Sequence, residues 1–126
     1  MWIPYNDNPK GNRTGDCTVR ALSLALGVCW EKAYDLMTEK GKSMGEMPSK
    51  DSVWSAVLRD HGFLRRAVPN FCPECYTVRD FASEHFRGVY VLAIGGHVVT
   101  VIDGDYYDLW DSGDEIPQYY FFRKGD

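Results

Sequence analysis

The sequence predicts a single α+β domain over residues 1–126, with helices first and an antiparallel sheet after them. Two observations predict this class. Apolar residues recur at helical spacing in the first half of the chain, and apolar or aromatic strands joined by short turns fill the last third. With 44% hydrophobic and 14% aromatic residues, the chain can bury a real core.

Glycines mark the expected helix ends. A first helix should begin at Asp16 or Cys17, and it is apolar nearly all round, which is typical of a buried helix. Residues 4–16 are rich in Asn, Gly, Pro and Asp and should form an irregular loop. The expected helices are 16–26, 30–40, 51–61 and 77–85, and the first three should end at Gly27, Gly41 and Gly62.

The last third of the chain predicts an antiparallel meander. Val89–Ile94 is a continuous apolar run, which is typical of a strand buried on both faces. Residues 103–105 should form the turn of a hairpin. The other expected strands are 97–102, 106–110 and 119–123, with a short one at 64–68.

Charge and hydropathy exclude some classes of function. The net charge is −4, the pI is about 5.3 and no basic stretch is present, so we expect no nucleic-acid partner. The apolar runs are too short to span a bilayer, and the first residues lack the pattern of a signal peptide. We therefore expect no membrane association and a cytoplasmic location, where the four cysteines stay reduced.

A cysteine at a helix start and a histidine at a strand start carry the functional signal. Cys17 opens the first helix, and His97 opens a strand after two glycines. A helix N-terminus stabilises a thiolate, and an imidazole on a strand can accept the thiol proton. A lone cysteine of this kind is more often packing, and a lone histidine can belong to a turn. Together with an acidic residue in hairpin register, they indicate a nucleophilic site.

The third member of the site depends on the hairpin loop. If the loop has three residues, His97 lies opposite Asp111; if it has two, His97 lies opposite Trp110, with Asp108 on the same face. Three-residue loops with glycine are common, so Asp111 is the predicted partner and Asp108 the alternative. Such a carboxylate would hold the imidazole tautomer. Asp111 can also be read as a turn residue alone.

Two charges close to Cys17 have opposite expected effects. The carboxylate of Asp16 disfavours a thiolate if it lies near the sulfur, whereas Arg20, one turn further along, favours the thiolate if it points the same way. The sequence leaves both directions open.

These residues stand in motifs that resemble a known superfamily. The chain resembles the papain-like cysteine peptidases, which use cysteine, histidine and carboxylate in this order. It looks closest to short uncharacterised proteins of bacteriophages and prophages of gut-type Firmicutes, and it also resembles the small peptidase domains that trim bacteriocin leaders. The motifs are Gly15-Asp16-Cys17-Thr18-Val19-Arg20-Ala21, Gly27-Val28-Cys29-Trp30-Glu31-Lys32-Ala33-Tyr34, Gly95-Gly96-His97-Val98-Val99 and Trp110-Asp111-Ser112-Gly113.

The resemblance implies a papain-like fold in which the Cys17 helix packs on a small antiparallel sheet. It implies a nucleophilic Cys17, a base in His97 and an orienting Asp111, acting through an acyl-enzyme on a peptide or protein substrate. A peptidase, amidase or isopeptidase in a bacterial or phage-infected cell is therefore the expected function. The alternatives are a non-catalytic phage binding module on the same fold and a transglutaminase-like acyl transferase.

The sequence departs from the superfamily at the oxyanion hole. Its members commonly place a glutamine six residues before the cysteine, and that position here is Gly11. Asn12, five residues before Cys17, is the candidate donor, with the Cys17 backbone N–H as the second.

A lone C-x-x-C motif, Cys72 to Cys75, is a weak zinc candidate. A structural zinc site needs four ligands, usually from two such pairs, so two reduced cysteines in a tight turn is the simpler interpretation. Cys29 is expected to be packed. We expect no metal and no cofactor.

Overall fold

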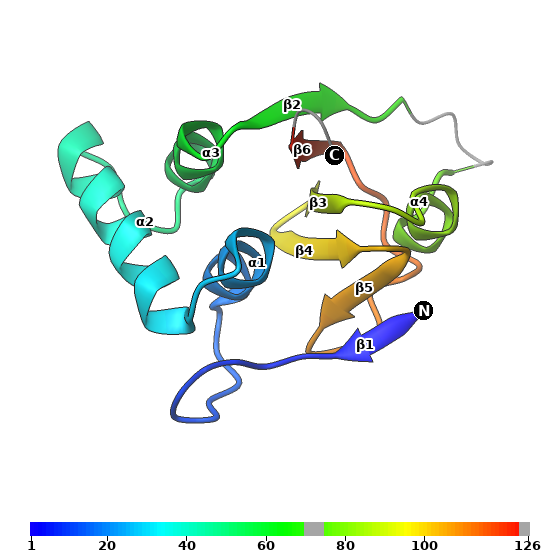
Figure 1. Cartoon of the computed structure of the whole chain (residues 1–126), viewed down its shortest axis with the longest axis horizontal. Helices are drawn as coiled ribbons and strands as arrows, with labels where there is room; N and C mark the ends of the chain where they lie inside the picture. The colour runs from blue at the N-terminus through cyan, green and yellow to red at the C-terminus, as the bar shows by residue number, and fades with distance from the viewer. Residues whose placement is uncertain (70–74, 124–126) are drawn as a thin grey trace.

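The computed structural model describes residues 1–69 and 75–123 and confirms a mixed α+β architecture (Figure 1). In these two ranges no helix is long and apolar enough to cross a bilayer. The described elements are β1 (Trp2–Pro4), α1 (Cys17–Leu26), α2 (Trp30–Met44), α3 (Asp51–Asp60), β2 (Phe63–Ala67), α4 (Val78–Glu84), β3 (Val89–Ile94), β4 (His97–Ile102), β5 (Asp105–Asp108) and β6 (Tyr119–Arg123).

The strands form one mixed sheet in the order β1-β5-β4-β3-β6-β2. Four neighbouring pairs are antiparallel, but β1 runs parallel to β5, with Pro4 opposite Asp108. The expectation of a purely antiparallel sheet is therefore wrong at this edge. Strand β1 was not predicted, because three residues that end in a proline carry no alternating pattern; they form a strand only through pairing with β5.

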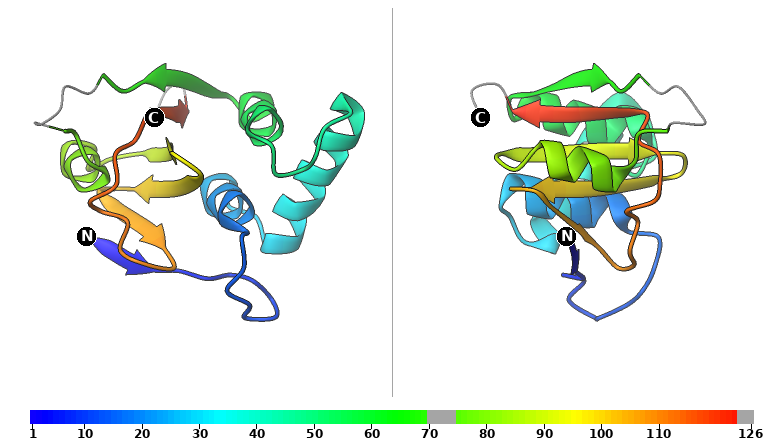
Figure 2. Two further views of the ribbon diagram at one scale, coloured as in Figure 1. Left: turned by 180° about the vertical axis from the view of Figure 1, so that it is seen from behind. Right: turned by 90° about the vertical axis from the view of Figure 1, so that its right-hand side faces the viewer.

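Helices cover both faces of the sheet (Figures 1 and 2). α1 and α3 lie against one face with α2 outside them, and α4 lies on the opposite face. Side chains of β3 alternate between these layers: Val91 and Ala93 join the core under α1, while Leu92 and Ile94 join the core under α4. Residues Val91–Ile94 are thus buried on both faces, as their continuous apolar sequence predicts.

The turn between β4 and β5 has two residues, not three. Asp103 and Gly104 both have positive φ, 50° and 85°, as a type I′ turn requires. The ladder closes directly on this turn, with Ile102 opposite Asp105. Because one residue of register moves every later side chain to the other face, the partner of His97 changes with it.

Gly41 does not end α2 as predicted. The helix continues to Met44 and stops at Gly45, while Gly41 is buried inside it. A Cβ at Gly41 would lie 2.8 Å from the Glu46 carbonyl oxygen and 3.2 Å from Cα of Pro48. The glycine therefore permits a close backbone approach, which brings the segment before α3 down onto α2.

Candidate active site

The fold places Cys17 in the first turn of α1, against the start of β4. The ladder between β4 and β5 ends at Thr100 and Tyr107. Before that point along β4, the backbone N–H of Val98 donates a hydrogen bond to the Cys17 sulfur. The N-terminus of α1 thus takes the place that a longer β5 would occupy. The amide and the helix dipole both favour a thiolate there.

His97 lies between Cys17 and a carboxylate. Its Nε2 is 2.6 Å from Oδ2 of Asp108, and its ring is hydrogen-bonded to the Cys17 side chain. With Nε2 taken by Asp108, Nδ1 is the ring nitrogen left for the sulfur. Trp110 packs on the imidazole with ring centroids 5.2 Å apart, which fixes the ring plane. Cys17, His97 and Asp108 therefore form one hydrogen-bonded chain.

Hydrogen bonds outweigh burial in setting the protonation of this pair. Burial raises the pKa of the Cys17 thiol, but hydrogen bonds from His97 and the Val98 amide, with the positive charges of His97 and Arg20, bring it below its ordinary value. Burial lowers the pKa of His97, but Asp108 and Cys17 raise it to about 9. Both shifts therefore favour the charged form of the pair, a thiolate beside an imidazolium.

Asp108 is the carboxylate that the two-residue turn brings to His97. It is 2% exposed, and its oxygens are well satisfied: Oδ2 accepts from the Ser112 hydroxyl and Oδ1 from the Leu109 backbone N–H, each at 2.8 Å. His97 also contacts Trp110, the residue expected opposite it when the loop has two residues. The alternative position predicted for a two-residue loop is the one observed.

The structure places Asp111, the predicted partner, away from His97. Its side chain is 46% exposed and faces Arg79, and its Oδ1 accepts hydrogen bonds from the Tyr106 hydroxyl at 2.5 Å and the Gly113 backbone N–H at 3.0 Å. The hydrogen bond from Tyr106 is the main cause of its lowered pKa. The prediction failed because it assumed one turn residue too many, which moved Asp111 to the wrong face.

The two charged residues close to Cys17, Asp16 and Arg20, are buried and form an ion pair with each other. Arg20 forms an ion pair with Oδ1 of Asp16, and its Nη2 lies 3.7 Å from Oδ1 of Asp108. The Oδ2 atom of Asp16 accepts from the Trp30 indole at 3.0 Å and the Asn8 amide at 3.3 Å. The Asp16 carboxylate is thus occupied by other partners, while Arg20 acts on the cysteine to favour the thiolate.

The thiol and the imidazole open onto a pocket of about 340 Å³. Ser49 and Asp51, from the start of α3, form one wall, and Gly95 and Gln118 form another. Polar side chains therefore form part of the lining of this pocket. A pocket of this size beside a nucleophile can receive part of a substrate.

The structure does not bring Asn12 to this pocket. Asn12 is exposed, its backbone carbonyl accepts from the Asn6 amide, and it lines the neighbouring cavity instead. Among the described residues, Gln118 is the one that presents a side-chain amide to the Cys17 pocket. Nothing in the sequence marked Gln118, because it precedes β6 and reaches the site only through the pairing of β6 with β3. Ser112 stood in a quoted motif, but its bond to Asp108 was not foreseen.

The other cysteines stand outside this site. Cys29 is a free thiol at the start of α2, and it is exposed rather than packed. Cys75 is disulfide-bonded, contrary to the expectation of reduced thiols, so it offers no thiolate to zinc; Cys72 lies outside the described residues. No group of three or more metal-binding side chains occurs in the part of the chain that the structure describes.

Comparisons with protein-family models, with curated proteins and with solved structures find no match to this chain.

Replacing the two aspartates separately should distinguish their roles. In Asp108→Asn, the pKa of His97 should fall from about 9 toward its ordinary value of 6.5, because the carboxylate that holds the proton is gone. In Asp111→Asn it should stay near 9. Following the His97 ring signals by NMR across a pH titration measures both. An equal fall in the two variants would contradict the assignment of Asp108.

The buried ion pairs of Arg20 should matter far more than an exposed one. Arg20→Met leaves two buried carboxylates without their cation and should lower the free energy of unfolding by about 3–5 kcal/mol. The control is Lys40→Met, which breaks the more exposed pair with Asp60 and should cost about 1 kcal/mol or less. Urea denaturation of both variants measures the difference. Similar losses would show that the Arg20 network is not a stabilising element.

Proposed function

We propose that this protein is a papain-like cysteine hydrolase that cleaves peptide or related amide bonds. The observation that carries the proposal is the hydrogen-bonded chain from Cys17 through His97 to Asp108, with the sulfur open to a pocket. The chain order of the three residues and the packing of α1 on β4 support the papain-like assignment. The carboxylate is Asp108, and Asp111 takes no part.

The proposed reaction has two steps. The Cys17 thiolate attacks the substrate carbonyl, the carbon–nitrogen bond breaks, and the leaving amine takes the proton from the His97 imidazolium, which leaves a thioester on Cys17. Water then attacks the thioester while His97 accepts its proton, and the acid product leaves as the thiolate and imidazolium are restored. Asp108 keeps the imidazole in place and stabilises its charged form.

The N-terminus of α1 supplies a donor for the oxyanion. The side chain of Asp16 makes no cap hydrogen bond to this helix. The first intrahelical bond runs from the Arg20 N–H to the Asp16 carbonyl, so the Cys17 N–H lies before the helical ladder. A tetrahedral intermediate on Cys17 would place its oxyanion next to that N–H. The Gln118 amide offers a further polar contact to the substrate within the pocket.

The first expected outcome is selective alkylation of Cys17. At about pH 6, iodoacetamide should modify Cys17 at least about tenfold faster than the exposed Cys29, because His97 and the Val98 amide lower the pKa of Cys17 and favour its reactive thiolate. In His97→Ala this advantage should disappear. Site-resolved mass spectrometry measures both rates in one sample, so that Cys29 serves as an internal standard.

A second histidine provides the matched control. His61 lies at the end of α3, with its Nδ1 2.8 Å from the Val57 carbonyl oxygen, so His61→Ala should leave the Cys17 rate unchanged. If wild-type Cys17 reacts no faster than Cys29, the thiolate pair does not exist. A non-catalytic binding module would then be the better account.

The second expected outcome is hydrolysis that depends on Cys17. The wild-type protein should cleave members of a degenerate pool of quenched peptides, and Cys17→Ala should cleave none. In oxygen-18 water each new carboxyl group should gain one heavy oxygen. The rate should fall as the pH rises above about 9, because His97 then lacks the proton for the leaving amine. Incorporation of an added primary amine in place of water would indicate the acyl transferase instead.

A further inference from the structure

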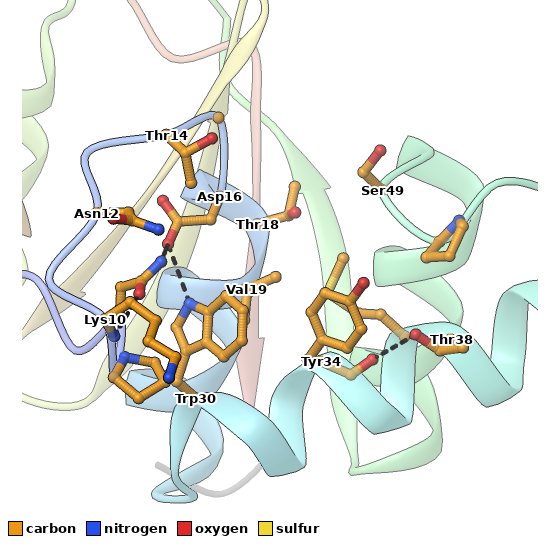
Figure 3. Close-up of a pocket in the computed structure, with 15 residues that line it drawn as sticks. Lys10, Asn12, Thr14, Asp16, Thr18, Val19, Trp30, Tyr34, Thr38 and Ser49 are labelled. Atoms are coloured by element: carbon orange, nitrogen blue, oxygen red, sulfur yellow. Dashed lines mark hydrogen bonds between the residues drawn. The ribbon is translucent and has the colours of Figure 1, made fainter.

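A second and larger cavity adjoins the Cys17 pocket. It has a volume of about 530 Å³ and lies between the N-terminal loop and α2. Figure 3 shows Lys10 on the loop at one side, Trp30 and Tyr34 along α2, and Thr18 and Val19 of α1 at the back. No step of the proposed reaction uses this cavity.

Two stacked aromatic rings form one wall of the cavity. Trp30 and Tyr34 are four residues apart on α2, so they share a helix face, and their ring centroids are 5.2 Å apart with planes 27° apart. The stack holds Tyr34 in place although its side chain is 49% exposed. An ordered aromatic surface that faces a cavity is suited to binding a flat or apolar group.

The indole N–H and the backbone carbonyl of this wall already have partners. The Trp30 indole N–H donates to Asp16, and the Thr38 hydroxyl donates to the Tyr34 carbonyl at 2.9 Å (Figure 3). Asp16 itself is paired with Arg20. Apart from the Tyr34 hydroxyl, the two rings therefore present carbon surface, and a charged occupant would lose most of its hydration without compensation.

The charged groups of the lining disfavour a cationic occupant. Lys10 lies at the loop side of the cavity, and the carboxylate of Asp16 is neutralised by its buried ion pair. A second cation close to Lys10 would be repelled, whereas a neutral ring would meet no penalty.

The cavity adjoins the Cys17 pocket. Gly15, Thr18 and Ser49 line both, and Gly15 lies two residues before Cys17. A ligand that reaches from the sulfur into the cavity must therefore pass over the N-terminus of α1. An extended polypeptide advances about 3.3–3.6 Å per residue, so a side chain in the cavity belongs to a residue within about three positions of the reacting carbonyl.

We propose that this cavity is a specificity subsite that binds a large aromatic or apolar side chain of a polypeptide substrate, close to the bond cleaved at Cys17. The proposal rests on the proposed function, because it concerns the substrate of the same nucleophile. It makes Tyr34 a specificity-determining residue with no part in the chemistry.

The test is the sequence preference of cleavage. Mass spectrometry of the products from a degenerate quenched peptide pool should show Phe, Tyr, Trp, Leu and Met enriched about tenfold at one position within three residues of the cut. Tyr34→Ala should reduce this enrichment to about threefold or less. Tyr34→Glu should shift the preference at that position toward Lys and Arg, because it places a carboxylate on the wall.

A matched control separates the subsite from a general aromatic effect. Phe86 is 69% exposed and lies in the connection between α4 and β3, so Phe86→Ala should keep the wild-type preference. The rate of Cys17 alkylation by iodoacetamide, which needs no subsite, reports whether each variant retains its nucleophile.

A second measurement does not depend on cleavage. In Cys17→Ala protein, N-acetylphenylalaninamide should shift the NMR signal of the Trp30 indole N–H, and N-acetyllysinamide at the same concentration should not.

The outcomes distinguish the two proposals. Cleavage without enrichment, or an enrichment that Tyr34→Ala and Tyr34→Glu leave unchanged, overturns the subsite and leaves the hydrolase standing. A selectively reactive Cys17 with no shift of the Trp30 signal also overturns the subsite. An ordinary Cys17 thiol together with an uncleaved peptide pool overturns both.

Discussion

The site depends on one buried interaction, in which the guanidinium of Arg20 lies between the carboxylates of Asp16 and Asp108. Arg20 belongs to α1 and Asp108 to β5, so the ion pairs join the helix that carries Cys17 to the strand whose carboxylate contacts His97. Each side chain of this trio is at most 6% exposed, and none would be stable there alone. The network fixes where Cys17 meets His97.

The shortness of β5 is the second requirement. The β4–β5 ladder includes no residue of β4 before Thr100. The start of β4 is therefore free to contact α1, and the Val98 N–H donates a hydrogen bond to the Cys17 sulfur. β1 then covers the far edge: the Asp108 carbonyl accepts from the Tyr5 N–H at 3.0 Å and from the Trp2 indole at 3.1 Å. Those bonds satisfy the backbone of a residue whose side chain must stay buried.

The two cavities flank the N-terminus of α1 because three segments converge on it. The N-terminal loop approaches through the Asn8 contact with Asp16, and α2 through the Trp30 contact with the same carboxylate. The segment before α3 comes close because Gly41 has no side chain. Asp16 therefore has two roles: it neutralises Arg20, and it anchors the walls of the proposed subsite.

Local periodicity, turn residues and side-chain chemistry are enough to predict the α+β class, most helices and strands, and the pair Cys17 and His97. The carboxylate beside His97 can be identified only in the folded chain. The choice between Asp111 and Asp108 turned on one residue of loop length, and a two-residue and a three-residue turn are both compatible with the local sequence. Three other features could not be predicted, because each depends on contacts between residues far apart in the chain. They are the edge strand β1, the approach of Gln118 to the Cys17 pocket, and the position of Arg20 between two carboxylates.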